Sequence, residues 1–271
     1  MSEFVDAKTL RKAQLEMLKI LIHVDRVCQE NNIDYWLDAG TLLGAVRHGG
    51  FIPWDDDIDI CMRRSDFNKF LELKSEFTDK LYVQLNCGVY KNGNNPCKIR
   101  LKDTKFVELS DSNINISNDD NGIFVDIFPV DKFSQKKYVR KIQRLPSVLF
   151  YLKFSTKFIK HKNNLRKIIS KASFLIPWVV VNAVHKMVVN YSEKIETDYQ
   201  LGFGVETLLG YLGHTEEKDL YPLKKLSFEG YDFYVPNAYQ KWLRVRYGED
   251  YMVLPPESKR TWHAIKIELE E

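Results

Sequence analysis

Residues Trp36-Leu-Asp-Ala-Gly-Thr-Leu-Leu-Gly-Ala-Val-Arg-His-Gly-Gly-Phe-Ile-Pro-Trp-Asp-Asp-Asp-Ile-Asp-Ile60 carry the strongest structural signal in this chain of 271 residues. A small-residue turn, Gly40-Thr41, precedes the basic pair Arg47-His48 and a break at Gly49-Gly50. Four carboxylates then stand within five positions, at Asp55, Asp56, Asp57 and Asp59. Small-residue turns that open a helix suit phosphate, and clustered carboxylates suit cations. The stretch therefore predicts a site for a phosphorylated substrate.

The acidic residues are predicted to bind a divalent metal ion. If residues 57–62 form a strand, alternation places Asp57 and Asp59 on one face and Ile58 and Ile60 on the other. Two neighbouring carboxylates repel each other unless a cation lies between them. Mg²⁺, or Mn²⁺ in its place, prefers such oxygen ligands. The alternative is a solvated acidic turn, which the apolar Ile60-Cys61 pair after it disfavours.

The run from Gly40 to Asp59 resembles the signature of the LicD family, the relatives of fukutin and of fukutin-related protein. The resemblance covers roughly residues 10–131 and 220–265, and it implies a nucleotidyltransferase fold. It also implies transfer of a phospho-alcohol, typically phosphocholine from CDP-choline, onto a cell-surface glycan. Weaker parts of the resemblance are Lys98-Ile-Arg-Leu, Phe124-Val-Asp-Ile-Phe-Pro129, Phe228 to Pro236, Arg246 to Met252, and Arg260.

The expected fold is α+β, with a nucleotidyltransferase-like mixed β-sheet core flanked by helices and a basic helical insert. Apolar residues at helical spacing predict a long helix over 8–31. Three segments are expected: a catalytic core over 1–131, the insert over 132–192, and a C-terminal part over 193–271 that completes the catalytic domain. Strands are expected at 33–37, 57–62, 81–85, 96–102, 105–109 and 123–128, and a polar loop at 110–122.

Asp126 is the candidate third carboxylate of the metal site. It is the only charged residue of an apolar run, and burial of a charge is costly unless it is paired or bound to metal. The resemblance implies that a carboxylate from a neighbouring strand completes the site and in some members acts as the base for the attacking hydroxyl. A buried structural ion pair is the alternative. Asp131 is a weaker candidate for the role given to Asp126. Asp55 is expected to support the site or its loop without binding the metal directly.

Phosphate contacts are expected from the backbone amides of Gly40 and Thr41 at a helix N-terminus. Arg47 suits bidentate binding of the pyrophosphate, and His48 either joins it or positions a loop. Lys98 and Arg100 alternate on one strand face, either toward the active site or on a solvated edge. The resemblance alone suggests that Arg260 and His263 close the site. Aromatic faces bind quaternary ammonium groups, so Trp36, Trp54 and Tyr90 are candidates for a choline site.

Charge is distributed unevenly along the chain. From Lys132 to Ser192 there are fourteen Lys and Arg and no Asp or Glu, which leaves 26 basic and 37 acidic residues elsewhere, a net charge of −11. Apolar and basic residues that interleave in this way are typical of helices on anionic membranes. Ordinary helices that cover the core are the alternative, and nucleic acid is disfavoured because no recognition motif accompanies the charge.

The sequence therefore predicts a metal-dependent phosphocholine transferase. Transfer of phosphoethanolamine, glycerol phosphate or ribitol phosphate, or nucleotidyl transfer, are the enzymatic alternatives. A non-catalytic protein that binds anionic lipid or glycan is the alternative of another class. The expected partners are a CDP-alcohol donor and a glycan or lipid-linked glycan acceptor of teichoic acid or lipopolysaccharide type. Without a secretory signal or a cysteine framework, the expected location is cytoplasmic, at the inner face of the membrane.

Overall fold

The computed structural model of the chain describes residues 5–77, 80–85, 97–108, 121–158, 168, 171–173, 175–207, 215–260 and 263–269. The chain forms two compact units, which are described separately. Unit 1 comprises Met1–Gln84, Cys97–Phe128 and Lys218–Glu271, and unit 2 comprises Leu85–Pro96 and Pro129–Glu217. The predicted three-segment division at positions 131 and 192 stays a prediction.

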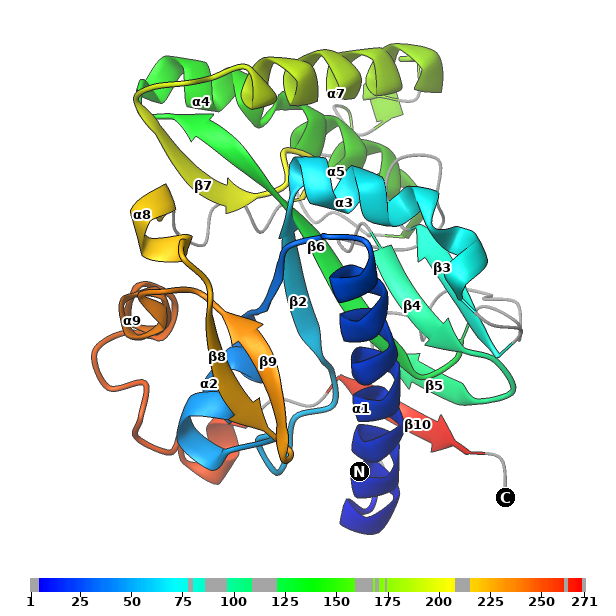
Figure 1. Ribbon diagram of the computed structural model, residues 1–271. Helices are drawn as coiled ribbons and strands as arrows, with labels where there is room; N and C mark the ends of the chain where they lie inside the picture. The colour runs from blue at the N-terminus through cyan, green and yellow to red at the C-terminus, as the bar shows by residue number, and fades with distance from the viewer. Residues whose placement is uncertain are drawn as a thin grey trace. The chain divides into compact units, whose positions relative to one another are not determined.

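A mixed sheet with helices around it forms the centre of unit 1, which confirms the predicted α+β fold class. Its strand order is β1-β2-β6-β4-β3 (Figure 1). Strand β6 is long, and its first half pairs antiparallel with β4. The bounds are β1 (Tyr35–Leu37), β2 (Asp59–Arg63), β3 (Leu81–Leu85), β4 (Cys97–Leu101) and β6 (Phe124–Ser134). The predicted strands near these positions are thereby confirmed, apart from the start of β2.

Strand β2 begins at Asp59, two residues later than predicted. Asp57 therefore precedes the strand, but burial still alternates as predicted: Asp57 and Asp59 are half-buried, and Ile58 and Ile60 are buried. The Asp59 amide donates to the Thr41 hydroxyl at 2.8 Å, while the Ile58 carbonyl accepts from the Asp126 amide at 2.8 Å. The first bond ties the start of β2 to α2, and the second aligns the segment before β2 with β6 beside Asp126.

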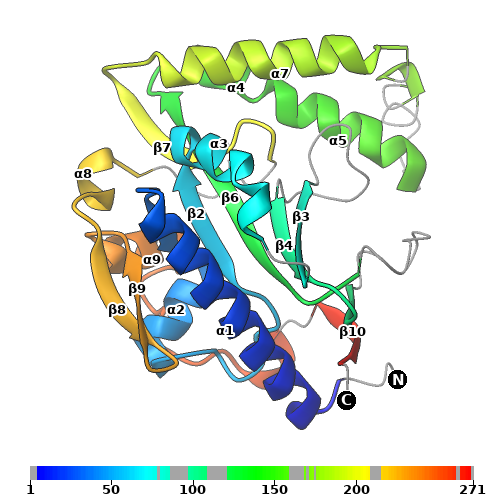
Figure 2. The same cartoon turned by 45° about the vertical axis from the view of Figure 1, so that its right-hand side comes forward.

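Helix α1 (Ala7–Glu30) confirms the predicted N-terminal helix. Asp6 caps it, because its carboxylate accepts from the amides of Lys8 and Thr9. Its apolar stripe is buried, and the helix contacts β4 and β10 (Figures 1 and 2). The buried apolar positions of the stripe are Leu10, Ala13, Met17, Leu18, Ile20, Leu21, Val24, Val27 and Cys28.

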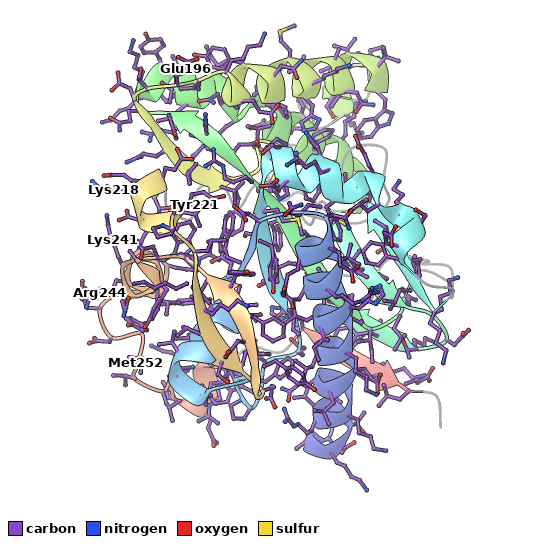
Figure 3. The ribbon with its side chains drawn as sticks, viewed as in Figure 1. Glu196, Lys218, Tyr221, Lys241, Arg244 and Met252 are labelled. Carbon is purple, nitrogen blue, oxygen red and sulfur yellow. The ribbon has the colours of Figure 1, made fainter. Side chains whose placement is uncertain are left out.

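The remaining elements of unit 1 surround β1 and β2. A hairpin, β8 (Lys224–Phe228) and β9 (Tyr231–Val235), is followed by α9 (Tyr239–Tyr247). Lys241 on α9 is labelled in Figure 3. Its ammonium group pairs with the Asp219 carboxylate at 2.6 Å. A two-stranded sheet pairs β5 (Lys105–Glu108) with β10 (Ala264–Glu268). The helical elements are α2 (Ala39–His48), α3 (Arg64–Glu72), α8 (Glu217–Leu220), which starts at the last residue of unit 2, and the short turns Lys74–Glu76 and Glu257–Lys259.

Unit 2 is built on the second half of β6, which pairs antiparallel with β7 (Tyr199–Phe203). Three helices, α4 (Lys137–Gln143), α5 (Leu145–Phe158) and α7 (Trp178–Glu193), accompany this ribbon. Gln143 joins the parts, because its side chain accepts from the Ser134 amide and donates to the Lys132 carbonyl and the Ser192 hydroxyl. In the described part of the chain, no helix is both long and apolar enough to cross a membrane.

Gly44 gives a test of the close packing between α2 and the turn after it. A methyl group at Gly44 would lie 2.5 Å from the Gly50 carbonyl oxygen. Replacing a helical glycine by alanine normally stabilises a protein by about 0.5–1 kcal/mol. We expect Gly44→Ala to lower the free energy of unfolding instead, by about 1–3 kcal/mol, because of overpacking. Thermal unfolding measures this, with Asn68→Ala on the exposed face of α3 as a control that should be neutral or stabilising. A higher melting temperature for Gly44→Ala would contradict the packing.

Candidate active site

The turn that opens α2 lies directly against the acidic run. A Cβ atom at Gly40 would lie 2.6 Å from an Asp55 carboxylate oxygen, so only glycine permits this approach. The Thr41 hydroxyl accepts from the Asp59 amide at 2.8 Å. Asp38, the N-cap residue, makes no side-chain capping bond to the first turn of α2. The predicted phosphate turn and the predicted carboxylates are therefore neighbours, as the sequence suggested.

Asp59 is surrounded by negative charge. Burial raises the pKa of the Asp59 carboxyl well above its ordinary value, and repulsion from Asp57, Asp126, Asp55 and Asp38 raises it further. The pKa of Asp55 is also raised, first by burial and then by Asp57 and Asp56, although His263 and Arg47 oppose this effect. A protein that keeps so many carboxylates together gains stability when a proton or a cation joins them.

Asp126 is half of a buried ion pair. It faces Lys98 across the β4–β6 ladder, and its two carboxylate oxygens lie 3.0 and 3.2 Å from the Lys98 ammonium group. The exposed fractions of the two side chains are 5% for Lys98 and 4% for Asp126, and the ammonium group also lies 3.3 Å from the centre of the Phe124 ring. Asp126 therefore forms the buried ion pair that was the alternative to a role as metal ligand or base. The role as metal ligand or base stays a prediction.

Arg100 is placed differently from Lys98. Its guanidinium donates to the Gln84 side chain and to the Gly122 carbonyl, and it lies 4.9 Å from the centre of the Phe124 ring. Both basic residues are buried, so the solvated-edge alternative does not apply to this strand. Lys98 accompanies the predicted catalytic carboxylate, whereas Arg100 contacts the residues around the start of β6.

Asp56 anchors the segment that leads into β10. Its carboxylate, 1% exposed, accepts from the amides of His263 and Ala264 at 2.8 and 2.6 Å, and its other oxygen lies 2.9 Å from His263 Nδ1. His263 Nδ1 also lies 3.8 Å from an Asp57 oxygen. The C-terminal residue His263 thereby reaches the acidic run, and Asp56 positions it there.

One group of side chains in the described part of the chain is close enough to hold a metal ion. Among the described residues, the ligand atoms that lie within 4.8 Å of one another belong to Asp56, Asp57 and His263. The predicted set of Asp57, Asp59 and Asp126 shares Asp57 with it. The three N–H donors on Asp56 occupy its oxygens, which suits a positioning role better than metal binding. Lys98 likewise contacts both oxygens of Asp126, and the metal-binding role of Asp57, Asp59 and Asp126 stays a prediction.

His48 and Arg260 contact Trp54, and Arg47 lies next to His48. The Arg260 guanidinium lies 4.1 Å from the Trp54 ring centre, and the His48 ring packs edge-on against Trp54 at 6.4 Å. Arg47 donates to the Tyr251 carbonyl at 3.0 Å. Burial and the neighbouring Arg47 lower the pKa of His48, which favours its neutral form. Arg260 covers the Trp54 face, which was a candidate surface for choline.

Several site residues were not found by sequence reasoning. Asp38 accepts from Trp242 Nε1 at 2.9 Å and from the Arg246 guanidinium at 3.2 Å, and Cys61 Sγ lies 3.1 Å from it. Asp38 stands inside the quoted motif, and Arg246 begins one of the weaker resembling runs. Their pairing spans more than two hundred positions, so no local pattern could reveal it. Asp131, the weaker substitute, accepts from the Val205 amide within unit 2.

Comparison with known proteins gives a family match over residues 32–168, to the LicD/FKTN/FKRP nucleotidyltransferase domain. The chain is 30% identical to lipopolysaccharide cholinephosphotransferase LicD of Haemophilus influenzae, over 95% of this chain and 97% of that protein. It is 40% identical over 52 residues to ribitol 5-phosphate transferase FKRP of Homo sapiens, which covers 19% of this chain and 10% of that protein. An uncharacterised protein of Rickettsia prowazekii is 36% identical over 87 residues, 32% of this chain and 31% of that protein.

The raised pKa of Asp59 predicts how stability depends on pH without metal. The folded state binds this proton more tightly than the unfolded state, so stability is lost as pH rises from about 4 through the raised pKa. Asp59→Asn cannot ionise, and we expect it to raise the melting temperature at pH 7 and to change it little at about pH 4. Each kcal/mol corresponds to roughly 2–4 °C. Asp232→Asn, at an exposed position on β9, is the control and should change the melting temperature little. If Asp59→Asn lowers the melting temperature at pH 7 and the control does not, the repulsion among the carboxylates is contradicted.

Proposed function

Because the chain belongs to the LicD/FKTN/FKRP family of nucleotidyltransferase domains, we propose that it transfers phosphocholine from CDP-choline to a glycan acceptor. The full-length relative is named a cholinephosphotransferase, and the short match is named a ribitol 5-phosphate transferase. Both names describe transferases of a phosphate-linked alcohol. This activity class is shared by the cholinephosphotransferase and the ribitol 5-phosphate transferase, and phosphocholine is favoured because the former matches along almost the whole chain.

The observation that supports an active transferase is the crowding of Asp59 by other carboxylates. Repulsion from Asp57 and Asp126 in a buried place is destabilising, and a structural site has no need of it. A protein that only bound lipid or glycan would be more stable with asparagine at these positions. The non-catalytic alternative is disfavoured for this reason.

Mg²⁺ or Mn²⁺ is the metal that these residues suit. Asp57, Asp59 and Asp126 would hold it, since their carboxylates offer an all-oxygen donor set. When bound, the metal supplies positive charge that neutralises the phosphate oxygens of the donor. His263, which lies between Asp56 and Asp57, would keep the acidic run in place.

The chain's own residues have separate roles in the transfer. The amides at the start of α2 bind a donor phosphate, because the helix N-terminus carries partial positive charge and Asp38 leaves it uncapped. The acceptor hydroxyl oxygen forms a new bond to the transferred phosphorus as the bond to the departing CMP breaks. Asp126 takes the hydroxyl proton, and Lys98, 3.0 Å from it, holds the carboxylate in position.

Donor identity is the most direct test of the proposal. We expect CMP release with CDP-choline to exceed that with CDP-ethanolamine, CDP-glycerol or CDP-ribitol, and chelation by EDTA to stop it. Asp57→Asn and Asp59→Asn should reduce turnover at least a thousandfold, because charge stabilisation at the transferred phosphate is worth several kcal/mol. The control variant Asp232→Asn should release CMP at the normal rate. Full activity in excess EDTA would contradict the metal assignment, and pyrophosphate release would indicate nucleotidyl transfer instead.

Asp126 can be tested apart from its structural role. Asp126→Asn keeps an acceptor for Lys98 but cannot take a proton, so we expect the rate per folded molecule to fall by about a hundredfold to a thousandfold. Lys98→Met leaves a buried carboxylate without its ammonium partner, and we expect it to lower the free energy of unfolding by about 3–5 kcal/mol. Turnover and thermal unfolding are measured on the same samples. A normal rate for Asp126→Asn would contradict its role as the base and would show that Asp126 acts only through its ion pair with Lys98.

A further inference from the structure

Helix α7 of unit 2 is apolar on two opposite sides. One side is buried in the unit through Val181, Val188 and Val189. The other side exposes four residues at a spacing of four positions, which places them in one row along the helix. The exposed fractions are 79% for Val179, 70% for Met187 and 48% for Tyr191, and Ala183 between them is also exposed. A helix that is apolar all round is normally covered on all sides.

Further apolar side chains are exposed on α4 and just before α7 in the same unit. Figures 1 and 2 both show α4 beside α7. On α4, Tyr138 and Ile142 are one helical turn apart and expose 67% and 62% of their surface. Leu175, just before α7, exposes 85%. Exposed apolar groups of this number indicate an interaction surface. We call it the α4–α7 surface, defined by Tyr138, Ile142, Leu175, Val179, Met187 and Tyr191.

Positive charge surrounds this surface. The stretch from Lys132 to Ser192 has fourteen basic residues and no acidic residue. Among its described lysines, Lys136, Lys137, Lys141, Lys171 and Lys186 are exposed. Lys153 is an exception, because it is buried with its ammonium group 5.0 Å from the Trp178 ring centre. The exposed lysines therefore lie on or just before α4 and α7, and the one acidic residue that these two helices carry is Glu193 at the end of α7.

This charge identifies the kind of partner. Two copies of the chain that met through the α4–α7 surface would bring two strongly basic surfaces together, and like charges repel. A nucleic acid would match the charge but would not cover valine and methionine. An anionic lipid surface matches both, because its headgroups attract lysine and its acyl boundary accepts apolar side chains. We propose that the α4–α7 surface binds the surface of an anionic phospholipid membrane.

Binding to vesicles tests the proposal on the full chain, and it requires no turnover. The probes are vesicles of phosphatidylcholine alone and vesicles that also contain phosphatidylglycerol. We expect co-sedimentation with the anionic vesicles, weak binding to the neutral ones, and release at high salt, since salt screens charges beyond about 3 Å at 1 M. The triple variant Lys137→Gln, Lys141→Gln and Lys186→Gln should weaken binding on the order of a hundredfold, about fivefold for each lysine.

A matched pair of methionine variants tests the apolar part of the surface. Met187→Glu places a carboxylate on the α4–α7 surface, whereas Met252→Glu makes the same change at a residue of unit 1 that is 49% exposed (Figure 3). Both residues are exposed, and thermal unfolding confirms that each variant is folded. We expect Met187→Glu to weaken binding to anionic vesicles at least tenfold and Met252→Glu to change it less than twofold.

Three outcomes would overturn the proposal. Equal binding to neutral and anionic vesicles, or binding to neither, would remove the role of charge. Equal effects of Met187→Glu and Met252→Glu would show that the α4–α7 surface is not the contact. A dimer in lipid-free solution that Met187→Glu dissociates, measured by analytical ultracentrifugation, would show that a second copy covers the surface.

Discussion

Repulsion among clustered buried and half-buried aspartates is the constraint on which the rest of unit 1 depends. Several carboxylates act on Asp59, and each must be matched by positive charge or by N–H donors if the unit is to fold. Two of them, Asp38 and Asp126, are matched by groups from distant parts of the chain, and so is the neighbouring Asp56. The matches are Arg246 and Trp242 on Asp38, Lys98 on Asp126, and His263 with the Ala264 amide on Asp56. The acidic run thereby joins α9, β4 and β10 into one unit.

This arrangement connects stability with function. The partners fix the geometry of the outer carboxylates, while the largest charge effects on Asp59 all come from carboxylates. A metal-binding transferase benefits from such a centre, because the cation relieves repulsion that the fold maintains. Proteins commonly lose some stability at functional sites in this way. Unit 2 follows different rules: its amide and hydroxyl network at Gln143 fixes the helices, and its exposed surface combines lysine with apolar groups.

The sequence by itself determined the features that depend on local patterns. Helical periodicity identified α1, and apolar runs identified the sheet strands, because burial of one face repeats with the period of each element. The motif from Gly40 to Asp59 indicated the family and placed the phosphate turn beside the carboxylates. The contact between Gly40 and Asp55 agrees with this. Charge composition alone identified the basic stretch that forms α4, α5 and α7.

Only the tertiary structure decided how the charges are matched. The motif could not show that β2 starts at Asp59, because the Thr41 hydroxyl holds the Asp59 amide at that point. Alternation on β4 placed Lys98 and Arg100 on one face, but the register with β6 put Lys98 on Asp126 and left Arg100 to the Gly122 turn. Ion pairing depends on distance through space, whereas periodicity reports only a residue's neighbours along the chain. Pairing across two hundred positions therefore requires the folded chain.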